Sequence, residues 1–104
     1  MKTDNSVRKV GENIVAQWLS EKGYVTNVGS NSSIDIAIEA KGPVKSLVIL
    51  VTPMVQCKES VFPSYEELKK VKFHAAKLEC DPYEAIVPLD ENFKLTGQIQ
   101  FRRL

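Results

Sequence analysis

The sequence is poor in the residues that build zinc sites and disulfide frameworks. It has one histidine and two cysteines among 104 residues. No Cys and His set with zinc-ligand spacing exists, so a zinc site of that kind is excluded. We expect both cysteines to be reduced thiols in a cytoplasmic protein. Cys57 alternates with Gln56 and Lys58, and we expect it to point into the core.

Long hydrophobic runs and a strong charge of one sign are also missing. The apolar run over residues 47–55 is about half of the ~20 residues that a membrane span needs, and the first thirteen residues lack the apolar core of a secretory signal. We therefore expect no membrane partner. Fourteen basic residues against thirteen acidic ones give a net charge of +1. This balance neither requires nor excludes a nucleic-acid partner, because the distribution over the surface decides.

What is present is typical of one folded unit. Hydrophobic residues make up 43% of the chain and charged residues 26%, which is ordinary for a globular domain. No internal repeat, linker or low-complexity segment divides the sequence. We predict a single domain over residues 1–104.

The most informative stretch, residues 34–60, predicts two strands joined by a short turn. Its first part alternates apolar and polar residues, and residues 47–55 form the continuous apolar run of a strand covered on both faces. In an antiparallel hairpin the start of one strand lies beside the end of the other. Asp35 can therefore come close to Gln56 and Lys58. A carboxylate, an amide oxygen and an ammonium group at one strand end could form a metal site that hydrolyses a phosphodiester.

Two registers of this hairpin compete. With a turn over residues 42–45, the numbers of paired residues add to about 87 and Asp35 faces Thr52. With a turn centred near residues 45–46, they add to about 91 and Asp35 faces Gln56. In the first register, Thr52 and Met54 would stand where the metal site needs its second oxygen ligand and its lysine. Neither side chain can replace those groups.

Pro53 favours the second register. Proline cannot donate to a sheet ladder and often marks a bulge. A bulge at Thr52-Pro53 would slide Gln56 towards Asp35. We therefore predict the register in which Asp35 and Gln56 are opposite each other.

Two helices flank these strands. The first is predicted from Asn5 or Ser6 to Lys22, with Gly23 as its stop. Its apolar stripe consists of Val7, Val10, Ile14 and Trp18, widened by Val15 and Leu19. Gly11 would let this helix approach the sheet closely. Glu12 lies at the edge of the stripe, where the helix alone favours a surface position over one that reaches across the sheet end.

The second helix is predicted from residue 64 to residue 80. Ser64 and Glu67 form a capping box, and His74 is expected to be a partly buried packing residue. The expected buried stripe is Tyr65, Leu68, Val71, Ala75 and Leu78. The strongest basic clusters are Lys69, Lys70 and Lys72 on this helix, and Arg102 and Arg103 near the end. These residues are either solvated surface groups or phosphate contacts.

Shorter strands are expected over residues 24–28, 83–89 and 97–104. The element order is then αβββαββ. We predict an α/β fold in which helices flank a mixed β-sheet.

The order of four short motifs resembles the PD-(D/E)XK nuclease superfamily. These motifs are Gly11-Glu12, Gly23-Tyr24, Ile34-Asp35 and Val55-Gln56-Cys57-Lys58. The sequence is most similar to branches with Gln in place of the second acid, as in Mrr-type restriction enzymes and some intron homing endonucleases. The segment GENIVAQWLSEKGY is also similar to archaeal Holliday-junction resolvases. The resemblance covers about residues 8 to 88, and it implies a restriction-endonuclease-like fold.

The resemblance implies a divalent-metal-dependent DNA endonuclease. Asp35 would bind Mg²⁺ or Mn²⁺, with Gln56 as a second oxygen donor and the carbonyl of Cys57 as a third. Lys58 would orient the attacking water or stabilise charge on the phosphorus centre. Glu12 would reach the metal directly or through water. A homodimer would be the natural way to cut two strands, and no small-molecule cofactor is expected.

Two other functions stay open. The chain could keep the nuclease fold without catalysis and bind nucleic acid, as Thr52 and Met54 at the motif positions would suggest. It could also be a protein-interaction module in which the strand over residues 97–104 pairs with another chain.

Overall fold

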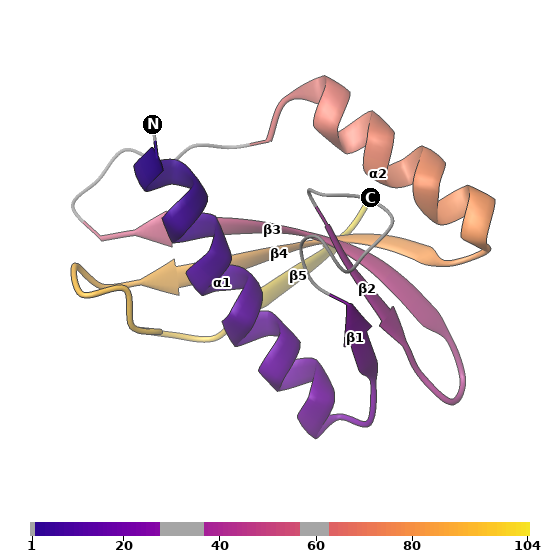
Figure 1. Ribbon diagram of the computed structural model, residues 1–104, viewed down its shortest axis with the longest axis horizontal. Coiled ribbons are helices and arrows are strands. Elements are labelled where there is room, and N and C mark those ends of the chain that lie inside the picture. Colours follow the sequence, from indigo (N-terminus) through magenta and orange to yellow (C-terminus); the bar gives the residue numbers. More distant parts are fainter. Residues whose placement is uncertain (1, 28–36, 57–62) are drawn as a thin grey trace.

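The computed structural model describes residues 2–27, 37–56 and 63–104, with side chains from residue 7 onward. Its elements are α1 (Lys2–Glu21), β1 (Val25–Asn27), β2 (Ala37–Lys41), β3 (Ser46–Val55), α2 (Tyr65–Leu78), β4 (Asp81–Leu89) and β5 (Gln100–Arg103). The strands form one sheet in the order β1-β2-β3-β4-β5. Neighbouring strands are antiparallel except β3 and β4, which are parallel and connected through α2 (Figure 1). The predicted α/β class with a mixed sheet and two helices is confirmed.

The helices pack on opposite faces of the sheet. On one face, Val15 and Leu19 of α1 share a core with Ile49 and Val51 of β3. On the other face, α2 packs through Val71 and Ala75 on β3 and its neighbours. Because β3 alternates between these two cores, residues 47–52 are all buried. The prediction of a strand covered on both faces is confirmed.

Helix α1 ends as predicted but begins earlier. Gly23 has φ of 95°, and the N–H groups of Gly23 and Tyr24 donate to the carbonyls of Ser20 and Leu19, the pattern of a Schellman stop. The helix begins at Lys2 rather than at Asn5 or Ser6, because residues 2–6 contain no proline or glycine to prevent it.

Gly11 brings α1 close to the sheet. A Cβ atom at this position would lie 3.0 Å from Cγ1 of Val51, which is tighter than ordinary packing allows. The absence of a side chain therefore sets how near α1 lies to β3, as the sequence predicted.

Helix α2 shows the predicted capping box but a different buried face. The Ser64 side chain accepts from the Glu67 N–H, and the Glu67 carboxylate accepts from the Ser64 N–H. Leu78, however, is 47% exposed and Tyr65 is 74% exposed, so the places of both in the buried stripe were wrong. At 100° per residue Tyr65 lies about 80° from Ala75 and about 120° from Val71, outside the narrow face they define. His74 is half-buried as expected, with its Nε2 2.8 Å from Oε2 of Glu39.

The register of the β2–β3 hairpin differs from the one we favoured. Ala37 pairs with Leu50 and Lys41 with Ser46, so paired numbers add to 87. The turn over residues 42–45 is closed by the Gly42 N–H, which donates to the Lys45 carbonyl at 3.1 Å. Strand β3 also pairs with β4 without interruption from Leu47 to Val55, so the bulge invoked at Thr52-Pro53 does not appear on that side.

The later strands shift by a few residues from their predicted positions. β4 begins at Asp81, two residues before the expected start, and it includes Pro82 instead of following it. β5 begins at Gln100 rather than at Gly97. The segment between β4 and β5 returns through a bridge between Leu89 and Leu95.

Candidate nucleic-acid interface

The solvent face of α2 combines exposed aromatic rings with lysines. Tyr65 is 74% exposed and Phe73 is 71% exposed. The Nζ atom of Lys69 lies 5.6 Å from the centre of the Tyr65 ring. At 100° per residue, Tyr65, Lys72 and Phe73 all lie within about 60° of Lys69 around the helix axis. We call Tyr65, Lys69, Lys70, Lys72 and Phe73 the α2 face.

The α2 face is a shallow hollow with an excess of positive charge. Its lining includes three lysines and one acid, Glu66. Within the described part of the chain, none of the three lysines forms an ion pair. The next acid along the helix, Glu67, lies 3.7 Å from Nη2 of Arg8 and caps the helix. The lysines are therefore available to an anionic partner.

Two of the four predicted nucleic-acid contacts lie on this face, and two have protein partners. Lys69 and Lys70 are exposed on α2. Arg102 donates from Nε (3.0 Å) and Nη2 (2.5 Å) to Oε1 of Glu84. Nη2 of Arg103 lies 3.3 Å from Oδ1 of Asp81. For the two arginines, phosphate contact stays a prediction.

The sequence reasoning missed the aromatic part of this surface. Tyr65 was assigned to the buried stripe, and Phe73 was not singled out. Both lie four residues from Lys69, one on each side, so a helical wheel centred on the lysine would have found them.

The Thr52 side chain forms a buried hydrogen bond. Its hydroxyl donates to Oε2 of Glu84 at 2.7 Å, and both residues are only 2% exposed. Since Arg102 binds the other oxygen of the same carboxylate, the three residues join β3, β4 and β5. This network satisfies a buried charge and holds the edge strand to the sheet.

Glu12 is buried, in contrast to the surface position that its helix suggested. It is 5% exposed, because the buried face of α1 is centred on Gly11, Val15 and Leu19 rather than on Val10 and Ile14. No hydrogen bond or ion pair to Glu12 is seen among residues 7–27, 37–56 and 63–104. In the described part of the chain no buried side-chain oxygen or nitrogen lacks a hydrogen-bond partner, so the carboxylate of Glu12 still touches solvent although the residue as a whole is buried.

The flank of α1 that carries Glu12 faces the β2 side of the sheet. Around the helix, Glu12 and Trp18 lie about 60° from Val15, on opposite sides. The Trp18 ring packs against Phe101 of β5 with 5.0 Å between centroids. Because β5 and β2 lie on opposite sides of the central strands, Glu12 points towards β2.

Of the other residues predicted for the metal site, the structure describes only Gln56. Gln56 directly follows β3, is exposed, and donates its N–H to the Leu89 carbonyl at 2.8 Å. Asp35, Cys57 and Lys58 lie outside the described residues. Among the residues the structure describes, no group of three or more His, Cys, Asp or Glu side chains could hold a metal ion. The described residues do not form a cation site by themselves, and the metal ligands stay a prediction.

Burial of Glu12 predicts a particular pH dependence of stability. Burial raises the pKa of the Glu12 carboxyl above the ordinary 4.5, and the charges of Arg8 and Lys9 only partly oppose this. Below pH 4.5 the group is protonated in both folded and unfolded chains. As pH rises through the raised pKa, ionisation favours the unfolded chain and stability is lost.

We therefore expect Glu12→Gln to gain stability relative to the parent protein as pH rises from 4 to 8, by on the order of 1 kcal/mol. Urea unfolding at a series of pH values measures this difference. Glu91→Gln, at an exposed position, is the control and should show no such trend. A parallel pH profile for Glu12→Gln and the parent would contradict the burial of an ionisable group.

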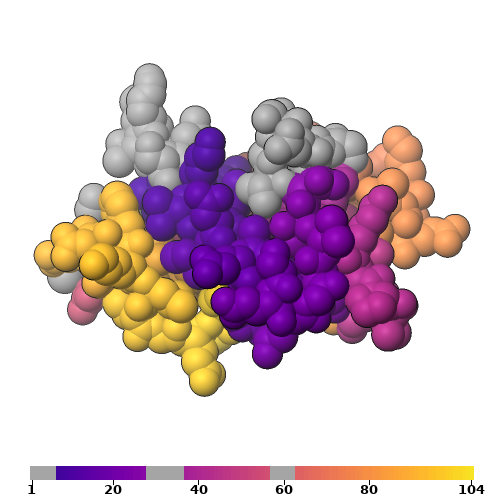
Figure 2. Space-filling model, turned by 60° about the horizontal axis from the view of Figure 1, so that its bottom comes forward, coloured from indigo at the N-terminus to yellow at the C-terminus, as the bar shows by residue number. Residues whose placement is uncertain are grey.

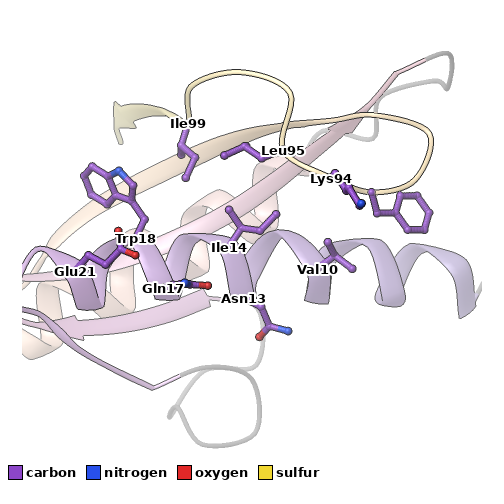
Figure 3. Close-up of a pocket in the computed structure, with 10 residues that line it drawn as sticks. Val10, Asn13, Ile14, Gln17, Trp18, Glu21, Lys94, Leu95 and Ile99 are labelled. Carbon is purple, nitrogen blue, oxygen red and sulfur yellow. The ribbon is translucent and has the colours of Figure 1, made fainter.

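A second hollow, of about 550 Å³, lies between α1 and the segment after β4. Figure 3 shows Val10 and Ile14 of α1 directed towards Leu95 and Ile99, while Asn13 points away. Its walls combine aliphatic and aromatic side chains with the polar Asn13, Gln17, Glu21 and Lys94, and we assign no ligand to it.

Comparison with known proteins assigns the chain to no family. No protein-family model matches the chain, and no curated protein matches it. In the described part of the chain, neither helix is long and apolar enough to cross a membrane.

Proposed function

We propose that this chain is a nucleic-acid-binding domain of nuclease-like architecture, and that it binds unpaired strands through the α2 face. The observation that carries the proposal is the pair of exposed rings, Tyr65 and Phe73, on either side of Lys69.

The chemistry of the α2 face suits a single strand. Stacking of a base on an aromatic side chain is worth ~1–3 kcal/mol and is tolerant of sequence. Tyr65 and Phe73 are separated by about 12 Å along the helix axis at 1.5 Å per residue, which leaves room for separate bases. The lysines between and beside them can neutralise the phosphates that connect those bases.

The charge of the α2 face argues against a second copy of the chain as its partner. A two-fold interface places the same patch on both subunits. Lys69, Lys70 and Lys72 would then face the lysines of the other copy, and like charges across an interface are unfavourable. A polyanion meets no such repulsion.

The topology supports the nuclease-like architecture. An N-terminal helix, an antiparallel meander of three strands, and a helical crossover to a strand parallel with the third follow the element order that the resemblance implies. Over the described hairpin the paired numbers add to 87, the register for which we expect Thr52 at the motif position. Thr52 is bound to Glu84, which supports binding over cutting.

Binding is tested with fluorescently labelled single-stranded oligonucleotides by anisotropy. We expect binding that persists in EDTA, weakens steeply with salt and is unchanged in Asp35→Ala. Duplex DNA of the same sequence should bind more weakly, because its bases are not free to stack. Binding that ignores salt concentration would contradict the proposal.

A second candidate is metal-dependent cleavage of DNA by the same domain. The position of Glu12, a mostly buried acid on the flank of α1 that faces β2, favours it. Supercoiled and branched DNA incubated with Mg²⁺ or Mn²⁺ should then be cut by the parent protein. Asp35→Ala and Lys58→Ala should abolish the cutting and leave oligonucleotide binding intact. If the parent cuts nothing, or if both variants still cut, this candidate is excluded.

A further inference from the structure

A hollow lined by aromatic rings lies on the opposite face of the sheet from α2. It has a volume of about 400 Å³, within the ~300–1,000 Å³ of small-molecule sites. Four rings and two lysines contribute to it: Trp18, Tyr24, Tyr83, Phe101, Lys22 and Lys45. We call it the aromatic pocket. Figure 2 shows this side of the molecule, with the end of α1 (purple) between the C-terminal segment (yellow) and the β2–β3 hairpin (magenta).

The rings of the aromatic pocket are held by packing. Trp18 and Phe101 contact each other at 5.0 Å between centroids. The Tyr24 ring lies against the hairpin turn, where a Cβ on Gly42 would come within 2.6 Å of Cε2 of Tyr24. Gly42 therefore leaves the space that this ring occupies. Tyr24, Tyr83 and Phe101 pack against the core beneath α1, and Trp18 is held against Phe101, so the walls are in place before any ligand arrives.

The lysines of the aromatic pocket stack on its rings rather than pairing with acids. Nζ of Lys22 lies 5.2 Å from the Trp18 ring centre, and Nζ of Lys45 lies 6.0 Å from the Tyr83 ring centre. Within the described part of the chain neither lysine has a carboxylate partner. Arg103 also lies near Tyr83, at 5.9 Å, and its partner is Asp81. The rim is therefore positively charged above an aromatic floor.

We propose that the aromatic pocket binds a nucleobase that carries a phosphate, either as a free nucleoside monophosphate or as the 5′-terminal nucleotide of a strand. The base would stack on the rings. The two ammonium groups, on flexible stems, would move from the ring faces to the phosphate. A neutral aromatic ligand would leave the lysines without a role, and an aliphatic anion would leave the four rings without one. This site lies apart from the α2 face and does not depend on the function proposed for it.

The chain has one tryptophan, so Trp18 reports on this pocket directly. We expect AMP to quench its fluorescence along a saturable curve. Adenosine should bind at least tenfold more weakly, and ribose 5-phosphate should cause no quenching. N-acetyltryptophanamide titrated in parallel corrects for absorption by the nucleotide.

The variant Lys22→Ala/Lys45→Ala should raise the Kd for AMP about tenfold, as expected for loss of charge-assisted contacts. Both lysines are exposed, so the fold should persist, which circular dichroism checks. Lys41→Ala/Lys94→Ala, at exposed positions outside both the aromatic pocket and the α2 face, is the matched control and should leave the Kd unchanged. Quenching that rises linearly with AMP concentration, or a Kd for AMP that is the same in both double variants, would overturn the proposal.

Oligonucleotides with and without a 5′-phosphate separate the two sources of the ligand. A strand that quenches Trp18 only when 5′-phosphorylated, and competes with AMP, identifies a strand terminus. Quenching by AMP alone identifies a free nucleotide. Failure of all these probes to quench Trp18 would refute the site while leaving the α2 face untested by this measurement.

Discussion

Removing charge from the α2 face should weaken binding to a single strand and reduce its salt dependence together. We expect Lys69→Ala/Lys72→Ala to lose about tenfold or more in affinity at ~0.1 M salt. The slope of log K against log salt should fall by about 1.4, since each phosphate contact on a single strand contributes ~0.7. Anisotropy titrations at several salt concentrations measure both quantities.

Removing the rings should change the affinity without changing that slope. Tyr65→Ala and Phe73→Ala are each expected to cost ~1–3 kcal/mol of binding, since a stacked base is lost and no charge is removed. Both side chains are largely exposed, so the stability of the fold should be nearly unaffected.

Lysines elsewhere on the surface supply the control for this experiment. Lys41 and Lys94 are exposed and lie outside the α2 face, so Lys41→Ala/Lys94→Ala has the same net charge as Lys69→Ala/Lys72→Ala. If both pairs reduce affinity equally, the attraction is a general effect of net charge and α2 is not the interface.

Loss of Arg102 should be the most destabilising change among the surface arginines. Arg102→Ala removes the cation that binds the Glu84 carboxylate, which is 2% exposed. A buried charge left without its partner costs ~3–5 kcal/mol. The Arg102 side chain is 61% exposed, so water can replace part of its contribution, and we expect a loss of about 3 kcal/mol. Denaturant unfolding measures it.

Arg103 is a close control, because it neighbours Arg102 in β5 and its side chain is 60% exposed. Its partner Asp81 is 33% exposed and can be solvated. Arg103→Ala should therefore cost no more than ~1 kcal/mol. Equal losses of unfolding free energy in Arg102→Ala and Arg103→Ala would show that the ion pair with the buried Glu84 stabilises the fold no more than the exposed pair does.

Local chemistry in the sequence was enough to predict much of this fold. Gly23 and the capping box at Ser64 specify two helix ends through their own backbone hydrogen bonds. The apolar run over residues 47–55 specifies a strand that needs cover on both sides. These features depend on residues close in the chain, so they can be interpreted without coordinates.

The exposed rings of α2 were also within reach of the sequence. Helical geometry alone places Tyr65 and Phe73 beside Lys69. The error was to extend the buried stripe to both ends of the helix, where Tyr65 and Leu78 are exposed. Tyr65, in the first turn, lies about 80° from Ala75 and about 120° from Val71 around the helix axis.

Tertiary structure decided the hairpin register and the position of Glu12. The two competing registers differ by four in the sum of paired numbers, an even shift that leaves every side chain on the same face. Hydrophobic alternation therefore cannot distinguish them, and the turn closed between Gly42 and Lys45 does. Glu12 lies at the edge of a helical stripe, and its burial depends on how close Gly11 lets α1 approach β3. That distance is set by packing between segments forty residues apart, which no pattern within either segment contains.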